Sequence, residues 1–76
     1  MSKADEMFNE LDYKKDIDVE YGLIRYNKED EKYIRFIIED KVIEANSIEN
    51  NDVWILSIDM KLLQAINEKV KELKWI

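Results

Sequence analysis

The residues of this sequence that could do chemistry are almost all carboxylates. They lie in three short runs, which are Asp16, Asp18 and Glu20, then Glu29, Asp30 and Glu31, then Glu39 and Asp40. General acid–base catalysis needs a carboxylate in a desolvated cleft, where its pKa is shifted toward the working pH. These runs fall in predicted turns or on the outer row of a predicted strand. We therefore interpret them as solvated and predict no catalytic residue.

Nucleophilic and metal-binding chemistry has few candidates. The 76 residues contain no cysteine and no histidine, which excludes thiol nucleophiles, imidazole bases and Cys/His zinc sites. Ser57 has no histidine partner, and pairing with Lys61 would need a particular fold context. Residues 16–20 resemble the start of an EF-hand loop, but Tyr21 stands in place of the glycine at loop position six and Asn27 occupies position twelve. We therefore predict a protein that is not an enzyme and that has no metal and no cofactor.

The charge balance narrows the kind of partner. Twelve basic and eighteen acidic residues give a formal charge of −6. Residues 1–59 contain 16 acidic and 8 basic residues, whereas residues 60–76 contain 2 and 4. A basic patch for nucleic acid or an anionic membrane is not expected, and a partner protein with a basic surface is favoured. Without a run of 18 apolar residues, we also expect a soluble, intracellular protein with no membrane association.

Hydrophobic periodicity predicts two helices that enclose a set of strands. A first helix of about ten residues follows Ser2, a suitable N-cap, with apolar residues at 4, 7, 8 and 11. A last helix follows Asp59, with a stripe formed by Leu63, Ile66, Val70 and Leu73 and with Leu62 beside it. Both helices are amphipathic, so each needs a surface on which to pack its apolar side.

Four strands are predicted between the helices. Apolar and acidic residues alternate over residues 17–23, and the strand continues to Tyr26 with a bulge near Gly22. Further strands cover residues 33–39, 42–48 and 53–58, the last a nearly continuous apolar run of the kind that is buried on both faces. Short reversals imply an antiparallel meander. We predict one α+β domain over residues 1–76, a two-layer, four-stranded antiparallel meander flanked by an N-terminal and a C-terminal helix (α-β-β-β-β-α).

One face of this sheet is expected to lack a cover. If Ile34 and Phe36 face the helices, then Tyr33 and Ile37 face away, and we place Tyr26 with them. Alternate acids on the first strand would lie about 6.6 Å apart, close to two phosphate steps of a nucleic-acid strand. Such a row imitates phosphates and fits a Lys/Arg channel. The predicted partner-binding residues are Asp16, Asp18, Glu20, Glu29, Asp30, Glu31, Tyr26, Tyr33 and Ile37.

The C-terminal third carries a resemblance to a group of known proteins. Residues 54–75 contain the pattern L-L-x-A-I-N-x-K-x-x-E-L-x-W, which is similar to the end of many small phage- and prophage-encoded proteins of Gram-positive bacteria. Lys74 stands where those proteins usually have glycine. The resemblance implies a mobile element in a bacterial cytoplasm. In size and charge the chain also resembles anti-CRISPR and other anti-defence inhibitors, which act by stoichiometric binding.

Two functional hypotheses follow. The first is a non-enzymatic binding protein of phage type. It would inhibit a host defence enzyme of the CRISPR type that acts on nucleic acid, and it would contact the enzyme and not the nucleic acid. The alternative is a structural or regulatory homodimer assembled through the open sheet face, with no inhibitory role.

Overall fold

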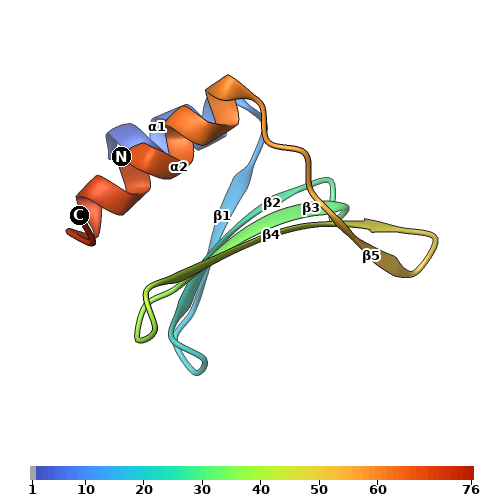
Figure 1. The fold of residues 1–76 in the computed structure, drawn as a ribbon, viewed down its shortest axis with the longest axis horizontal. Coiled ribbons are helices and arrows are strands. Elements are labelled where there is room, and N and C mark those ends of the chain that lie inside the picture. Colours follow the sequence, from blue (N-terminus) through green and yellow to red (C-terminus); the bar gives the residue numbers. More distant parts are fainter. Residues whose placement is uncertain (1) are drawn as a thin grey trace.

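The computed structural model describes residues 2–76 and shows two helices packed on one face of a five-stranded sheet (Figure 1). The elements are α1 (Lys3–Glu10), β1 (Lys14–Asp18), β2 (Leu23–Lys28), β3 (Lys32–Ile37), β4 (Val42–Glu49), β5 (Asp52–Ile55) and α2 (Met60–Glu72). All strand pairs are antiparallel and follow the order of the chain. The predicted α+β meander is confirmed, with five strands instead of four.

The additional strand arises where one long strand was predicted over residues 17–26. The chain instead reverses at residues 19–22, so that Ile17 pairs with Ile24 across a hairpin. Gly22 has a positive φ of 63°, which glycine adopts without steric penalty. The Asp18 carboxylate accepts a hydrogen bond from the Tyr21 N–H at 3.1 Å and stabilises the turn. The change of alternation near Gly22 therefore marks a turn and not a bulge.

The β4–β5 reversal is a two-residue turn at Asn50 and Asn51. Both residues have positive φ, 52° and 66°. Two successive positive φ values are the signature of a type I′ hairpin turn, and asparagine tolerates them better than most residues. Glu49 and Asp52 face each other across this turn.

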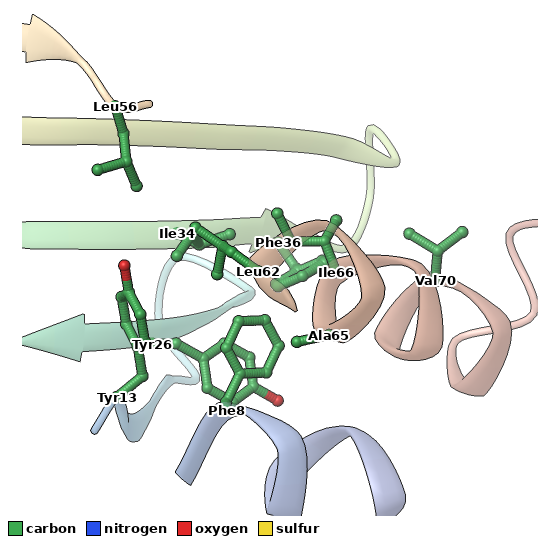
Figure 2. Packing of buried hydrophobic residues seen from close by; sticks show 10 residues of the cluster. All are labelled: Phe8, Tyr13, Tyr26, Ile34, Phe36, Leu56, Leu62, Ala65, Ile66 and Val70. Carbon is green, nitrogen blue, oxygen red and sulfur yellow. The ribbon is translucent and has the colours of Figure 1, made fainter. Parts of the chain in front are cut away.

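The hydrophobic core lies between the helices and the middle of the sheet (Figure 2). Phe8, Tyr26, Ile34 and Phe36 are its largest fully buried side chains. Phe8 of α1 stacks on Tyr26 of β2 with ring centroids 3.9 Å apart. Phe36 of β3 meets both rings edge-on, which is a favoured geometry for aromatic pairs. This cluster fixes the short helix α1, which would be unstable alone.

Both predicted helix starts are confirmed. The Ser2 hydroxyl accepts from the Asp5 N–H at 3.1 Å, and the Asp59 carboxylate accepts from the Leu62 N–H at 2.9 Å. The buried side of α2 differs slightly from the predicted stripe, because Leu62 is buried whereas Leu63 is 37% exposed. Helix α2 packs along α1 as well as on the sheet, which rotates the buried side toward Leu62.

The prediction that residues 53–58 form a strand buried on both faces is wrong. β5 ends at Ile55, and all four of its residues are exposed. Only Leu56, just beyond the strand, reaches the core (Figure 2). β5 is an edge strand, and Figure 1 shows that it extends away from the helices, which lie toward the other end of the sheet. Over residues 2–76, neither helix has the length and apolarity needed to cross a bilayer.

Candidate functional site

The face of the sheet that points away from the helices, called the outer face below, has a row of four charged residues at its centre. The register sets Asp16, Arg25, Arg35 and Glu44 side by side across β1 to β4. Arg25 forms an ion pair with Asp16, and Arg35 forms one with Glu44 at 3.0 Å. The two arginines lie directly opposite each other, a like-charge arrangement that destabilises a strand pair.

A shallow hollow opens beside the two arginines. It has a volume of about 300 Å³ and is lined by Arg25, Asn27, Asp30, Tyr33, Arg35 and Ile48. The Arg35 guanidinium lies over the Tyr33 ring, 4.8 Å from its centroid, in cation–π geometry. Within residues 2–76, the buried Nε atoms of Arg25 and Arg35 have no hydrogen-bond partner. The rest of each arginine side chain is about one-third exposed, 33% for Arg25 and 32% for Arg35, so both guanidinium groups can still donate hydrogen bonds to a carboxylate or carbonyl group.

Apolar side chains surround this charged centre. Leu23, Ile37 and Val42 form the next row of the outer face, and Ile48 faces Val53 further along β4 and β5. The placement of Tyr33 and Ile37 on the uncovered face is confirmed, since both alternate with the buried Ile34 and Phe36. The outer face therefore combines aliphatic, aromatic and charged groups in the manner of a protein interface.

The placement of Tyr26 is a correction. It was predicted on the uncovered face, but it is 1% exposed and points toward α1. The hairpin at residues 19–22 changes the alternation, so that Ile24 and Tyr26 share a side with Ile34 and Phe36. Tyr26 therefore belongs to the core and presents no surface to a partner.

The acidic residues of the first predicted run do not form a straight row. β1 ends at Asp18, Glu20 lies in the turn that follows, and Asp16 is paired with Arg25. The expected phosphate-like spacing over Asp16, Asp18 and Glu20 is therefore absent. Glu29, Asp30 and Glu31 lie in the β2–β3 turn, at the opposite end of the sheet. The structure thus places Asp18 and Glu20 at the end of the sheet opposite Glu29, Asp30 and Glu31, whereas Asp16 lies between them and lines one hollow together with Glu29 and Asp30.

The β2–β3 turn instead meets the β4–β5 turn to form an acidic end of the sheet. The Ile48 N–H donates to the Glu31 carbonyl oxygen at 2.6 Å, and a hollow of about 370 Å³ lies between Glu31 and Glu49. The acidic end comprises Glu29, Asp30, Glu31, Glu49 and Asp52. In the part of the chain that the structure describes, none of these five carboxylates has an ion-pair partner. The predicted partner-binding residues did not include Glu49 and Asp52, although the Asn-Asn turn between them indicated that they would face each other.

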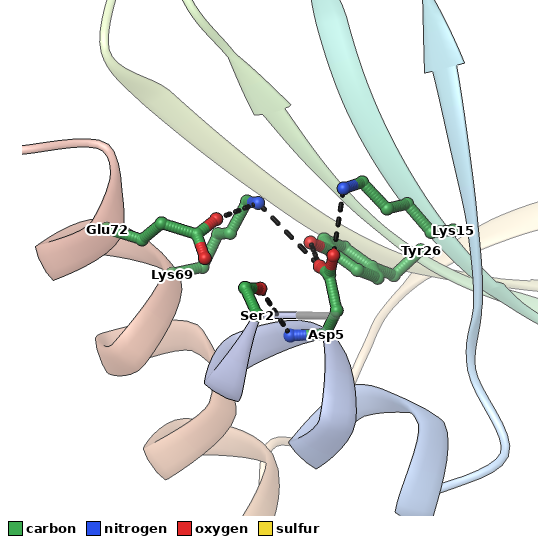
Figure 3. A network of polar contacts seen from close by, with 6 residues as sticks. All are labelled: Ser2, Asp5, Lys15, Tyr26, Lys69 and Glu72. Carbon is green, nitrogen blue, oxygen red and sulfur yellow. Dashed lines mark hydrogen bonds and ion pairs between the residues drawn. The ribbon is translucent and has the colours of Figure 1, made fainter.

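A second polar cluster lies between the helices and the sheet, with Lys69 and Tyr26 buried and Lys15 and Glu72 at its exposed edge (Figure 3). The Asp5 carboxylate accepts from the Tyr26 hydroxyl at 2.6 Å and from the Lys15 ammonium at 2.9 Å. Lys69 Nζ lies 3.7 Å from the same carboxylate and also pairs with Glu72. The cluster joins α1, α2, β1 and β2, so its first effect is to fix the helices on the sheet.

The surroundings of this cluster shift its pKa values. Burial opposes ionisation of Asp5, but hydrogen bonds from Tyr26 and Lys15 and the charge of Lys69 outweigh it and lower the pKa. The hydrogen bond from Lys69 lowers the pKa of Glu72. Burial, followed by the contact with Asp5, strongly raises the pKa of Tyr26. All these shifts favour the protonation states that bind one another, which is the behaviour of a structural network.

Across residues 2–76, no three acidic side chains converge in a way that could hold a metal ion. A scan against protein-family models finds no match, and no curated protein or solved structure matches this chain. The outer face exposes Val42, Ile48, Val53 and Ile55, and the acidic end exposes its carboxylates.

Proposed function

We propose that this protein acts without catalysis, by binding a partner protein through the outer face and the acidic end. The observation that supports this best is the outer face, a side of the sheet that neither helix covers. A solvated sheet face normally carries polar residues. This one carries Ile37, Val42, Ile48, Val53 and Ile55 around its charged centre. Exposed apolar residues gathered on one side are typical of interaction surfaces.

The shape of the outer face favours a protein over a small molecule. Its hollows are shallow and open to solvent, whereas small-molecule sites bury most of the ligand in an enclosed cleft. A protein partner can instead lie across several strands at once. Its carboxylate or carbonyl groups would accept hydrogen bonds from the exposed parts of the Arg25 and Arg35 guanidinium groups.

The acidic end favours a partner that is basic where it meets this part of the sheet. Glu49 and Asp52 face each other directly, which is unfavourable in the isolated protein. A lysine or arginine placed between them would relieve this repulsion and speed association by electrostatic attraction. The net charge of −6 adds to that attraction.

The proposed class of partner is an enzyme of host defence that holds nucleic acid in a basic channel. Occupation of that channel by the acidic end would inhibit the enzyme by stoichiometric competition. The support for this class is the excess of carboxylates and the five unpaired acids of the acidic end. The phosphate imitation is assigned to this end and no longer to Asp16, Asp18 and Glu20.

The test is capture of partners from host-cell lysate by the immobilised protein at low and high salt. We expect a basic protein to be retained at about 50 mM salt and released at about 500 mM. The double variant Glu49→Lys/Asp52→Lys should lose it. The control Glu39→Lys/Asp40→Lys makes the same charge change at the β3–β4 turn, at the opposite end of the sheet, and should retain it. The proposal would be refuted if the same protein were captured at both salt concentrations and by the Glu49→Lys/Asp52→Lys variant.

The alternative, a homodimer through the outer face, has weaker support. Apolar residues on that face favour it, but a two-fold axis through the centre would set the Arg25–Arg35 pair of one copy against the same pair of the other. Such an arrangement concentrates like charge in a desolvated interface. A dimer that the variant Tyr33→Glu disrupts would revive this alternative.

A further inference from the structure

The two edges of the sheet differ sharply in how they are protected. β1 has the sequence KKDID, in which four of five residues are charged. β5 has the sequence DVWI, and its Val53, Trp54 and Ile55 are 62%, 56% and 92% exposed. Natural sheets protect their edges with charges, proline, bulges or a covering segment, because an open edge pairs with other strands. β1 uses charge, whereas in β5 only Asp52, beside the turn, is charged, and Val53, Trp54 and Ile55 have none of these protections.

The backbone of β5 presents free hydrogen-bonding groups at this edge. Val53 pairs with Ile48. The Ile48 N–H points away from β5 and donates to the carbonyl oxygen of Glu31, in the β2–β3 turn. Val53 therefore faces Ile48 in a pair without mutual hydrogen bonds, and its own N–H and C=O point outward. Ile55, two residues later, points the same way. The geometry of the β4–β5 turn leads to the same assignment. A two-residue hairpin closes on a hydrogen-bonded pair, here Glu49 and Asp52, so the next pair, Ile48 and Val53, has no mutual hydrogen bonds.

We propose that β5 pairs antiparallel with β5 of a second copy, which joins two sheets into one of ten strands. This inference does not depend on the proposed function. With Trp54 on the two-fold axis, Val53 of each copy lies opposite Ile55 of the other. Both residues then use their outward N–H and C=O groups, which gives four backbone hydrogen bonds. The two Trp54 side chains meet on the helix side of the sheet, and Val53 and Ile55 extend the outer face.

The distribution of charge does not oppose pairing with a second copy at this edge. Residues 53–58 contain no charged side chain, so two copies can approach along this stretch despite the net charge of −6 on each. Antiparallel alignment places the acidic β4–β5 turn of each copy beside the uncharged residues 56–58 of the other. The like charges of the two turns are thereby kept at opposite ends of the junction.

The same geometry limits the assembly to two copies. A two-fold contact uses the same surface on both copies and closes on itself. The outermost strands of the joined sheet are then the two β1 strands, whose lysines and aspartates prevent further pairing. The result is a closed dimer with both outer faces on the same side.

Cysteine cross-linking tests the pairing and its register, because the natural chain contains no cysteine. Trp54 lies in the pair without mutual hydrogen bonds, where Cα atoms are about 4.5 Å apart, within the range that a disulfide spans. We expect Trp54→Cys to form a disulfide-linked dimer under mild oxidation. Val53→Cys and Ile55→Cys should cross-link poorly alone and efficiently when mixed. The matched control Ile48→Cys, on the neighbouring strand, should stay monomeric on a non-reducing gel.

Sedimentation velocity between about 1 and 200 μM gives the oligomeric state without cysteine. We expect Ile55→Lys to weaken dimerisation at least about tenfold, and Ile17→Lys, the same change on the β1 edge, to leave it unchanged. Thermal unfolding of both variants confirms that they fold. A protein that is monomeric throughout this range would overturn the proposal. So would a dimer that survives Ile55→Lys, or equal cross-linking by Trp54→Cys and Ile48→Cys.

Discussion

The ammonium group of Lys69 lies 3.7 Å from the Asp5 carboxylate, in a place where the lysine side chain is only 3% exposed. A buried lysine without partners would lose its proton or destabilise the fold. Here Asp5 and Glu72 both compensate it, and Tyr26 and Lys15 complete the hydrogen bonding of Asp5. The two helices are thus held on the sheet by charge as well as by the stacking of Phe8 on Tyr26.

Removal of the Lys69 charge should destabilise the protein strongly. Lys69→Met keeps much of the apolar volume but leaves Asp5 and Glu72 without their shared cation. Breaking a buried ion pair from one side costs about 3–5 kcal/mol, and we expect about 3 kcal/mol because Asp5 keeps Lys15 and Tyr26. Urea unfolding measures this loss. The exposed Lys71→Met, on the same helix, should change the free energy of unfolding by less than about 0.5 kcal/mol. Equal effects of the two substitutions would contradict the buried network.

Acid should destabilise the fold through Asp5 and Glu72. Both carboxyl groups have lowered pKa values in the folded protein, so between the folded and unfolded values the unfolded chain binds more protons. Their contribution is therefore present above the ordinary pKa values of 3.8 and 4.5 and is lost as the pH falls through the lower folded values. Thermal unfolding from pH 7 to pH 2 should show this decline. In Asp5→Asn the decline should be shallower, and an unchanged slope would argue against the assignment.

Alkali should destabilise the fold through Tyr26. Its folded pKa is raised, so the stability that its neutral hydroxyl provides is complete below the ordinary value of 10.0 and is lost as the pH rises above it. Tyr26→Phe removes this dependence and should flatten the stability curve above about pH 10. Tyr13, whose pKa burial also raises, should preserve part of the slope. Unfolding by urea at pH 9 and pH 11, compared between the two proteins, measures the difference.

Substitution of Gly22 should reveal the cost of the β1–β2 turn. A Cβ atom at this position would meet nothing within 4 Å, so sterics with neighbours play no part. The positive φ of 63° alone penalises a side chain. We expect Gly22→Ala to lower the free energy of unfolding by about 1 kcal/mol and Gly22→Asn to lower it by clearly less, because asparagine tolerates this conformation. Equal losses would show that the turn changes shape on substitution.

The helices and most of the sheet were predictable because local patterns determine them. Ser2 and Asp59 cap helices through their own side chains, and Tyr33 and Ile37 alternate with buried neighbours. The first hairpin was missed because the change of alternation between Ile17 and Ile24 was interpreted as a bulge near Gly22, whereas it marks a reversal of the chain. Alternation identifies faces, whereas a reversal between two similar strands depends on a few turn residues.

The binding face was predictable only in part. The number of helices already implies that one side of the sheet remains uncovered. The pairing of Asp16 with Arg25 and the contact of Glu31 with β4 depend instead on the strand register. The burial of Lys69 was indicated by the local sequence, because this residue lies seven positions after Leu62, on the buried side of α2. Its partner Asp5 is more than sixty positions away, and such a contact is set by tertiary packing alone.

The opposed arginines of the outer face allow a test of whether this surface serves the fold. A double-mutant cycle with Arg25→Gln, Arg35→Gln and the double variant cancels the loss of the ion pairs to Asp16 and Glu44 and isolates the coupling between the arginines. We expect a repulsive coupling of about 0.5 kcal/mol at low salt, the size of other cross-strand pairs. It should fall toward zero at about 0.5 M salt, where exposed charges are screened. An attractive coupling would mean that the pair stabilises the sheet. A repulsive coupling means that the two arginines oppose each other in the folded protein, which is expected of residues whose role lies in contact with a partner.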